Sequence, residues 1–248
     1  MNKLNWITHT LAALMIVLAA LGSLCSAVTQ TAFDTQLYSG KSRQSVMDTL
    51  GVTDAMDISA QTTAYIGLTD GEQSVFAQEM VSFMKGETDA QPAVLNERER
   101  QHMLDVRALV LLAQRMSQAF MTIAAGLAVV IAWTGAREKR RRVLPGMLIG
   151  VMITATAAVL ARVLMDVQGF EALFIRFHEL FFTNDLWLLD PQTDVLIRMM
   201  PQLLFERAAA DTAAAALRLF VIVCAMLCAV CFIVGGVIRR NLTERETP

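Results

Sequence analysis

Four long apolar runs dominate the pattern of hydrophobic and polar positions along this chain. They cover about residues 6–29, 113–135, 143–165 and 214–238. An α-helix needs about 20 apolar residues to cross the hydrocarbon core of a bilayer, and each run is long enough. The pattern therefore predicts an all-α polytopic membrane protein with four transmembrane helices, forming a single membrane domain over residues 1–248.

The first run also has features of a cleaved secretory signal. Cys25-Ser26-Ala27 is a weak mimic of a cleavage site. However, the run is long for the hydrophobic part of a signal, and bulky Leu24 stands where a lipoprotein signal has a small residue. We therefore interpret this run as an uncleaved first transmembrane helix.

Basic residues mark one side of the membrane. The hexad 137–142 follows the second run, Arg239-Arg240 follow the fourth, and Lys3 precedes the first. Positively charged loops remain in the cytoplasm, so we expect the basic loop 136–142 and both chain termini there. Residues 31–112 and 166–213 then form two extracellular segments of short amphipathic or interfacial helices.

The first extracellular segment has weaker helical patterns than the apolar runs. Residues 54–68 and 72–84 carry apolar positions at helical spacing. Asn96 and Glu99 have the spacing of a capping box, in which an N-cap side chain is followed three residues later by a glutamate. We predict that a helix begins there and continues into the second transmembrane span.

The second extracellular segment begins with an aromatic helix. On one neighbouring face of this helix, Glu171, His178 and Asp185 recur every seventh residue. Asp190-Pro191 has the pattern of an N-cap followed by a first helical residue, and Pro201 opens a further helix. The apolar face carries phenylalanines at helical spacing, namely Phe170, Phe174, Phe177 and Phe181.

Composition supports the membrane assignment and excludes some functions. The chain is 55% hydrophobic and 18% charged, whereas an average soluble domain has a higher share of charged residues. A net charge of -2 gives no footprint for nucleic acid. All four cysteines lie in apolar runs, which does not resemble a secreted disulfide framework. Three of them share one face of the fourth span and are interpreted as apolar lining, namely Cys224, Cys228 and Cys231.

Two histidines of the extracellular segments are the candidate catalytic residues. Glu99, His102 and Asp105 fall on one broad face of a predicted helix, and His178 lies among the phenylalanines. Two imidazoles that titrate near neutrality can divide one reaction, since one accepts a proton and the other donates one. His9 is predicted at the cytoplasmic end of the first span and is interpreted as structural.

Other chemistries lack their local patterns. The chain has neither a Gly-x-Ser-x-Gly elbow nor a His-Glu-x-x-His motif. Glu99-x-x-His102 matches half of a di-iron carboxylate site, but the pair is not repeated on another helix. A bis-histidine haem would need both imidazoles inside a helical bundle, whereas His102 and His178 are predicted in the extracellular segments. We therefore expect no metal and no cofactor.

Three arginines are predicted near the outer ends of different spans, namely Arg115, Arg162 and Arg218. Each alone is expected to extend to the level of the lipid headgroups. Together they form a candidate set of headgroup contacts, or they pair with Asp166 and Asp211.

Two stretches of the chain resemble known signature motifs. They are Asn96-Glu-Arg-Glu-Arg-Gln-His102-Met-Leu-Asp-Val106 and Phe177-His-Glu-Leu-Phe-Phe-Thr-Asn-Asp-Leu-Trp-Leu-Leu-Asp-Pro191. Both are similar to stretches of a family of bacterial four-helix membrane proteins that includes the lipoprotein intramolecular transacylase. The resemblance continues through Thr193-Asp194, Ile197 and Pro201. It implies a multi-pass enzyme of the bacterial cell membrane whose active site lies on the extracellular face.

The resemblance also implies a reaction. An acyl chain, taken to be the sn-2 chain, moves from the diacylglyceryl group of a lipoprotein's N-terminal cysteine to its α-amino group, giving a lyso-form lipoprotein. The implied partners are diacylglyceryl-modified lipoproteins and membrane lipid, with no nucleic acid. The family's catalytic histidines match His102 and His178. We assign His102 as base and His178 as acid, an order that can be reversed, with Glu99 or Asp105 orienting His102. The expected site-lining residues are Asn184, Asp185 and Trp187.

Two other classes of function remain open. The same histidines would also suit a different lipid-directed hydrolase or acyltransferase that acts on another headgroup. Alternatively, the chain is a non-catalytic scaffold or accessory protein whose histidines are interfacial. A transporter is disfavoured, because the spans show no paired broken helices and few charges at mid-depth.

Overall fold

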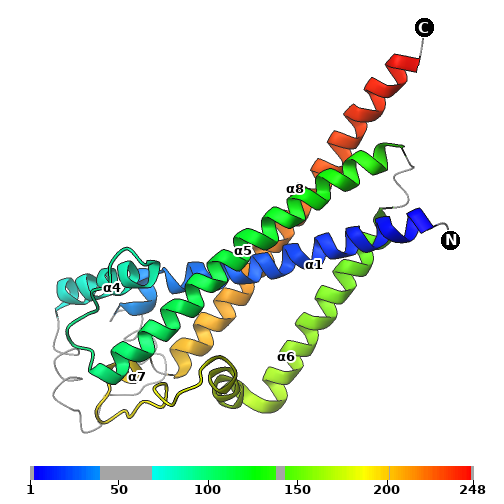
Figure 1. The fold of residues 1–248 in the computed structure, drawn as a ribbon. Helices are drawn as coiled ribbons and strands as arrows, with labels where there is room; N and C mark the ends of the chain where they lie inside the picture. The colour runs from blue at the N-terminus through cyan, green and yellow to red at the C-terminus, as the bar shows by residue number, and fades with distance from the viewer. Residues whose placement is uncertain (1–2, 40–68, 138–142, 201, 247–248) are drawn as a thin grey trace. The chain divides into compact units, whose positions relative to one another are not determined.

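Long α-helices organise the computed structural model, which describes residues 3–39, 69–137, 143–200 and 202–246. Within these ranges the chain forms helices and no β-strand. The long helices are α1 (Lys3–Ala32), α5 (Glu97–Arg137), α6 (Leu144–Phe181) and α8 (Gln202–Glu246) (Figure 1). The short ones are the 3-10 helix η1 (Thr35–Tyr38), α4 (Asp70–Lys85) and α7 (Val195–Met199).

Each long helix contains a candidate membrane span, and all four predicted spans lie on these helices. By length and apolar composition the candidate spans are Trp6–Ala32, Glu97–Trp133, Leu144–Phe181 and Gln202–Ile233. The prediction of an all-α chain with four membrane-spanning helices is thereby confirmed. The basic residues 138–142 lie outside the described residues.

The chain divides into two compact units. One, the bundle unit, comprises Met1–Ala27, Gln114–Val167 and Ala213–Pro248. The other, the histidine unit, comprises Val28–Ala113 and Gln168–Thr212. Because the long helices contribute residues to both units, the expectation of one membrane domain stays a prediction.

The bundle unit is held together by small and apolar side chains of its four helices. Gly146 and Gly150 let α6 approach α1 closely, because a Cβ at Gly146 would lie 2.4 Å from the carbonyl oxygen of His9. Such close approach of backbones is common in membrane helix pairs. Cys231 lies in the apolar core of this unit, where its thiol donates a hydrogen bond to the carbonyl oxygen of Ala128 over 3.6 Å. In Figure 1 the start of α1, the end of α5, the start of α6 and the end of α8 lie at one end of this unit.

The histidine unit has its own apolar core beneath α4. Thr69 and Glu72 form a capping box that starts α4, and Gly86 ends the helix in a left-handed conformation. The helix confirms the pattern predicted for residues 72–84, whereas residues 54–68 lie outside the described residues. The core comprises mainly Tyr38, Phe76, Met80, Phe83, Met84, Leu95, Met103, Val195, Leu196 and Met199.

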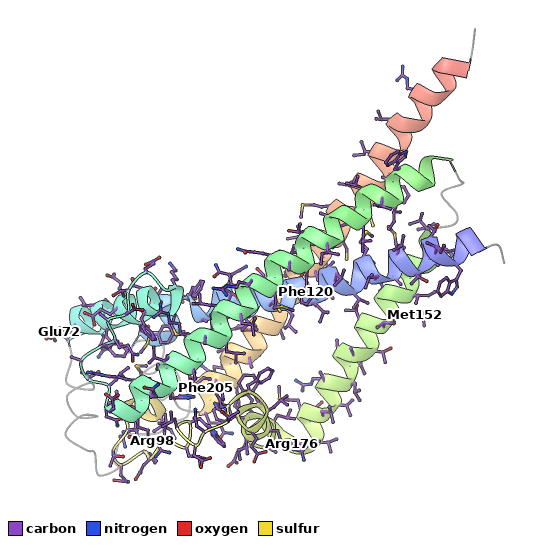
Figure 2. All side chains as sticks on the ribbon, viewed as in Figure 1. Glu72, Arg98, Phe120, Met152, Arg176 and Phe205 are labelled. Atoms are coloured by element: carbon purple, nitrogen blue, oxygen red, sulfur yellow. The ribbon has the colours of Figure 1, made fainter. Side chains whose placement is uncertain are left out.

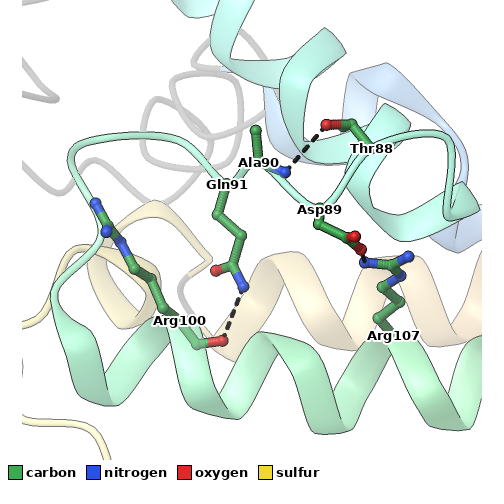
Figure 3. Close-up of polar contacts among 6 residues, drawn as sticks. All are labelled: Thr88, Asp89, Ala90, Gln91, Arg100 and Arg107. Atoms are coloured by element: carbon green, nitrogen blue, oxygen red, sulfur yellow. Dashed lines mark hydrogen bonds and ion pairs between the residues drawn. The ribbon is translucent and has the colours of Figure 1, made fainter.

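Polar contacts attach the connection between α4 and α5 to α5 itself (Figure 3). The guanidinium of Arg107 pairs with the Asp89 carboxylate at 2.9 Å. The same guanidinium carbon lies 4.8 Å from the ring centroid of Phe83. The Gln91 side-chain amide donates to the carbonyl of Arg100 at 3.1 Å. These contacts hold the connection along the turns of α5 that follow Glu99.

The predicted capping box at Asn96 is confirmed. The backbone N–H of Glu99 donates to Asn96 Oδ1 at 3.0 Å, and the N–H of Asn96 donates to Glu99 Oε2 at 2.8 Å. The helix that begins there runs to Arg137, as predicted.

The aromatic helix follows a break in the helical backbone of α6 at Gly169, which has φ 79 and ψ 162. The segment predicted to be the second extracellular one differs from the prediction in two places. Because α6 ends at Phe181, Asp185 lies in the following loop and not on the helical face of His178. No helix begins at Pro191: Asp190 caps a turn, accepting from the N–H of Gln192 at 2.8 Å. Helix α7 begins only after Asp194, and Pro201 lies outside the described residues.

Candidate active site

The two candidate histidines meet in the histidine unit, although they are far apart in the sequence. His102 lies on the second turn of α5, and His178 lies on the last turn of α6. Their ring centroids are 6.0 Å apart, with an angle of 35° between the rings. Both side chains are buried, each with 7% of its surface exposed. This spacing allows both imidazoles to contact one small reacting group.

Aromatic rings surround His178. The ring of Phe182 lies close to both histidines, at 5.3 Å from each ring centroid. The aromatic surroundings extend to Phe205 of α8, which is labelled in Figure 2. Its ring centroid lies 5.5 Å from that of Phe174. The remaining neighbours of His178 are Phe174 at 4.1 Å, Trp187 at 4.9 Å and Phe177 at 5.4 Å.

Hydrogen bonding distinguishes the two imidazoles. His178 Nδ1 lies 2.8 Å from the carbonyl oxygen of Phe174. Since a carbonyl oxygen can only accept, Nδ1 carries the proton, and a neutral His178 has its lone pair on Nε2. His102 Nδ1 is buried and has no hydrogen-bond partner within the described parts of the chain.

Glu99, one of the two residues predicted to orient His102, forms hydrogen bonds with other groups. Its carboxylate is fully buried and accepts from the backbone N–H of Asn96 at 2.8 Å and of Leu196 at 2.6 Å. These bonds engage both oxygens with the first turns of α5 and α7. Glu99 therefore stabilises the helix that carries His102 and does not hydrogen-bond the imidazole.

Asp105 also hydrogen-bonds a group other than His102. Its Oδ2 accepts from the side-chain amide of Asn184 at 2.9 Å. The side-chain oxygen of Asn184 in turn accepts from the N–H of Leu186 at 3.1 Å. Two turns earlier on α5, the guanidinium of Arg98, a residue labelled in Figure 2, donates to the backbone carbonyl of Asp185. Asp185 thus binds α5 through its backbone carbonyl, and the residue is exposed.

The comparisons with known proteins decide the family. The family model described as "Lipoprotein intramolecular transacylase Lit" matches residues 13–205, more than half of the chain. The chain belongs to this family. No curated protein matches it significantly in sequence.

Solved structures of a Lit protein share the fold of this chain. The lipoprotein intramolecular transacylase Lit from Bacillus cereus matches with a TM-score of 0.65 and 18% identity, over 93% of this chain and 97% of that one. A variant of the same protein with a histidine replaced by arginine matches with a TM-score of 0.61 and 16% identity, over 97% of this chain and 95% of the other. The variant with alanine at a histidine matches at 0.62 and 17%, over 92% and 93%.

The three arginines predicted to contact headgroups belong to the bundle unit, whereas His102 and His178 belong to the histidine unit. Arg115, Arg162 and Arg218 are all exposed. Arg162 pairs with Asp166 one turn away at 2.7 Å, which was one of the predicted alternatives. Exposed pairs of this kind contribute little to stability. A headgroup contact by the three arginines stays a prediction.

Asp194 is a buried residue of this Lit chain that the sequence reasoning left out of the site. It is 4% exposed and accepts from the Asn96 side-chain amide and the Asp190 backbone N–H, both at 2.7 Å. These two hydrogen bonds join the start of α5, at Asn96, to the turn before α7, at Asp190. An aspartate directly before the apolar run Val195-Leu196-Ile197 has the pattern of a helix start, which was the available signal.

Among the described residues, no group of three or more histidine, cysteine, aspartate or glutamate side chains is arranged to hold a metal ion.

Proposed function

We propose that this chain is a lipoprotein intramolecular transacylase that moves the sn-2 acyl chain of a diacylglyceryl-modified N-terminal cysteine to the α-amino group of the same cysteine. The product is a lyso-form lipoprotein with one amide-linked and one ester-linked chain. Membership of the Lit family supports the reaction class. Because donor and acceptor belong to one molecule, correct positioning supplies much of the rate enhancement.

The observation that carries this proposal is the pair of buried imidazoles with ring centroids 6.0 Å apart. An α-amine has a pKa of about 8 and must lose a proton before it can attack an ester. The glycerol oxygen must gain a proton when it leaves. Two imidazoles at this separation can serve both atoms of one short diacylglyceryl cysteine headgroup.

The hydrogen bond of His178 to the carbonyl of Phe174 favours His178 as the base. Its Nε2 lone pair takes a proton from the amine nitrogen while that nitrogen forms a bond to the ester carbonyl carbon. The proton passes from His178 to His102, directly or through water, and makes His102 an imidazolium. The tetrahedral intermediate then collapses, the bond from carbonyl carbon to glycerol oxygen breaks, and His102 donates this proton to that oxygen, which restores two neutral imidazoles. This order reverses the one first predicted from sequence.

Residues around the histidines have proposed supporting roles. The aromatic rings near His178 and the loop residues Asn184, Asp185 and Trp187 line the reacting group or hold its walls in place. Exposed Arg115, Arg162 and Arg218 contact lipid headgroups. Burial of the imidazoles among these rings keeps water from competing with the amine for the ester.

The proposed orientation places both termini in the cytoplasm and the histidines on the extracellular face. The basic loop between α5 and α6, together with Arg239-Arg240, supports this orientation. The start of α1, the end of α5, the start of α6 and the end of α8 share one end of the bundle unit (Figure 1). His102 precedes the span predicted at about 113–135 and His178 follows the one predicted at about 143–165, so a chain that crosses the membrane at both places has the two histidines on the opposite face.

Mass spectrometry of a reporter lipoprotein tests the proposal. The reporter is expressed in a host without any N-acyltransferase, together with the wild-type chain or with His102→Ala or His178→Ala. We expect an N-terminal lipopeptide with one amide-linked and one ester-linked chain from the wild type only. A free amine with both ester chains intact would contradict the transacylase. Loss of one chain to water would favour a lipid-directed hydrolase, and identical phenotypes of all three chains would favour a scaffold.

A further inference from the structure

Three residues of α5 form a stripe that faces the loop after α6. Arg98, His102 and Asp105 are spaced by four and three residues, so they lie along one side of the helix. The two outer members bind the loop: Arg98 binds the carbonyl of Asp185, and Asp105 binds the side chain of Asn184 at 2.9 Å. The catalytic candidate His102 lies between these two attachment points.

Asn184 connects this stripe to the local turn of the loop. Its amide nitrogen donates to Asp105, while its side-chain oxygen accepts from the N–H of Leu186 at 3.1 Å. The second bond is an Asx-type turn, in which an asparagine side chain fixes the backbone two residues later. The turn is extended by the N–H of Leu188, which donates to the carbonyl of Asp185 at 3.2 Å. The backbone is therefore held on both sides of Trp187.

Trp187 contacts the imidazole of His178. The ring centroids are 4.9 Å apart, and the rings are inclined by 31°. Phe174 and Phe177, by contrast, contact His178 from its own helix. A ring from the loop is thus coupled, through Asn184 and Asp105, to the helix of the other histidine.

We propose that Asn184, bonded to Asp105, is a positioning residue for the transacylase reaction: it holds Trp187 against His178 and so fixes the His178 imidazole relative to His102. This inference rests on the proposed function. The hydrogen bonds of the Asn184 side chain go to Asp105 and to the N–H of Leu186 and not to an imidazole, so we infer that it acts on the reaction through the loop. Small displacements of a catalytic group reduce the rate of a reaction that depends on orientation, by as much as about 100-fold.

The first test measures kcat and KM of purified full-length Asn184→Ala and Asn184→Ser on a diacylglyceryl lipopeptide with a free α-amine. Serine can retain the turn to Leu186 but is too short to reach Asp105. We expect both variants to lower kcat by about 10- to 100-fold with little change in KM. Thr183→Ala is the matched control, because Thr183 is exposed in the same loop, and it should match the wild type.

A reciprocal exchange separates positioning from general loss of structure. The double variant Asp105→Asn with Asn184→Asp exchanges donor and acceptor and can reform the hydrogen bond. Asn184→Asp alone places two carboxylates together, so we expect its kcat to stay low. On a logarithmic scale, the double variant should recover at least half of the kcat that Asn184→Asp alone loses. Failure of the exchange to recover activity would overturn the role of this bond.

Fluorescence tests the loop independently of the reaction. Trp6→Phe and Trp133→Phe leave Trp187 as the sole tryptophan of the sequence. In this background we expect Asn184→Ala to raise acrylamide quenching of Trp187 at least twofold and Thr183→Ala to leave it unchanged. Unchanged quenching, or unchanged kcat, in both Asn184 variants would overturn the inference. If the wild type lacked transacylase activity, the proposed function would fail, while the quenching result would still decide whether Asn184 holds Trp187.

Discussion

The carboxylate of Glu99 accepts a hydrogen bond at 2.6 Å from the backbone N–H of Leu196, which lies 97 positions further along the chain. The first N–H groups of a helix have no partner within that helix. Glu99 supplies an acceptor to the start of α7 and, through Asn96, to the start of α5. A single buried carboxylate thus joins the two helix starts, one turn before His102.

Glu99→Ala should lower the free energy of unfolding by about 2–4 kcal/mol, because it leaves two buried backbone N–H groups without acceptors. Glu99→Gln should cost less, since the amide oxygen still accepts one of the two bonds. Thermal unfolding in detergent measures both effects. Glu97→Ala, an exposed neighbour on the same helical turn, should change stability by less than about 0.5 kcal/mol. Equal losses from the two alanine variants would contradict the structural role of Glu99.

His178→Phe should separate chemistry from packing. The imidazole already lies among aromatic rings, so a phenyl ring can occupy its place while losing both nitrogens. Removal of a general acid or base typically costs about 10²- to 10⁴-fold in rate. We expect such a loss in the reporter assay, with a thermal midpoint within a few degrees of the wild type.

The control for His178→Phe is His9→Gln, which removes an imidazole from the bundle unit. It should leave the yield of lyso-form product unchanged. Similar yields from wild type and His178→Phe would contradict an acid–base role for His178.

Local sequence patterns predicted much of the fold. The four apolar runs, the capping box at Asn96 and the helix before Lys85 all depend on residues close together in the chain, so hydrophobicity and capping rules suffice for them. The end of α6 was harder to predict, because Phe182 continues the aromatic pattern past the last helical residue, Phe181. A proline at position 191 suggested a helix, but the turn at Asp190 is stabilised instead by the buried carboxylate of Asp194.

The candidate site was predictable as residue types but not as contacts. Topology assigned His102 and His178 to one side of the membrane, and the structure adds that their rings are neighbours. Leu196, which donates to Glu99, and Asn184, which donates to Asp105, are 97 and 79 positions away from these carboxylates. A spacing of three residues from His102 suggested that these carboxylates orient the imidazole, yet distant backbone and amide donors bind them. Which donors bind these carboxylates depends on how distant segments of the chain pack against α5.

Arg107→Ala should destabilise the chain more than Asp89→Ala does. The Arg107 side chain is largely buried, at 16% exposure, whereas that of Asp89 is 95% exposed. An exposed ion pair contributes less than about 1 kcal/mol, but Arg107 also lies over the ring of Phe83. We expect losses of about 1–2 kcal/mol for Arg107→Ala and less than half of that for Asp89→Ala in chemical unfolding. A larger loss from Asp89→Ala would show that the ion pair dominates.

Gly150→Ala should weaken the packing of α6 on α1. An added Cβ would lie 2.7 Å from the carbonyl oxygen of Ala13 and from Ile16 Cβ, so the two helices must move apart. Overpacking of this kind costs about 1–3 kcal/mol. Gly126→Ala is the matched control, because a Cβ there meets nothing within 4 Å. Thermal unfolding should show a lower midpoint for Gly150→Ala and an unchanged or higher one for Gly126→Ala; the reverse order would contradict the close approach.

Tyr38 should make the chain less stable at high pH. Its side chain is 3% exposed and donates to the carbonyl of Ala32 at 3.0 Å, and burial raises the pKa of the Tyr38 hydroxyl. The unfolded chain releases this proton above pH of about 10, while the folded chain still holds it. The free energy of unfolding should therefore fall as the pH rises above about 10, by up to about 1.4 kcal/mol per pH unit.

Tyr38→Phe isolates this effect. At pH 8 the variant should be less stable than the wild type by about 1 kcal/mol, because it lacks the hydrogen bond to Ala32. Above pH 10 the phenylalanine has no proton to lose, so the difference should shrink and then change sign. Denaturant unfolding at pH 8, 10 and 11 measures this. Parallel curves for the two chains would show that the buried phenol does not control alkaline stability, since all other titrating groups are common to both.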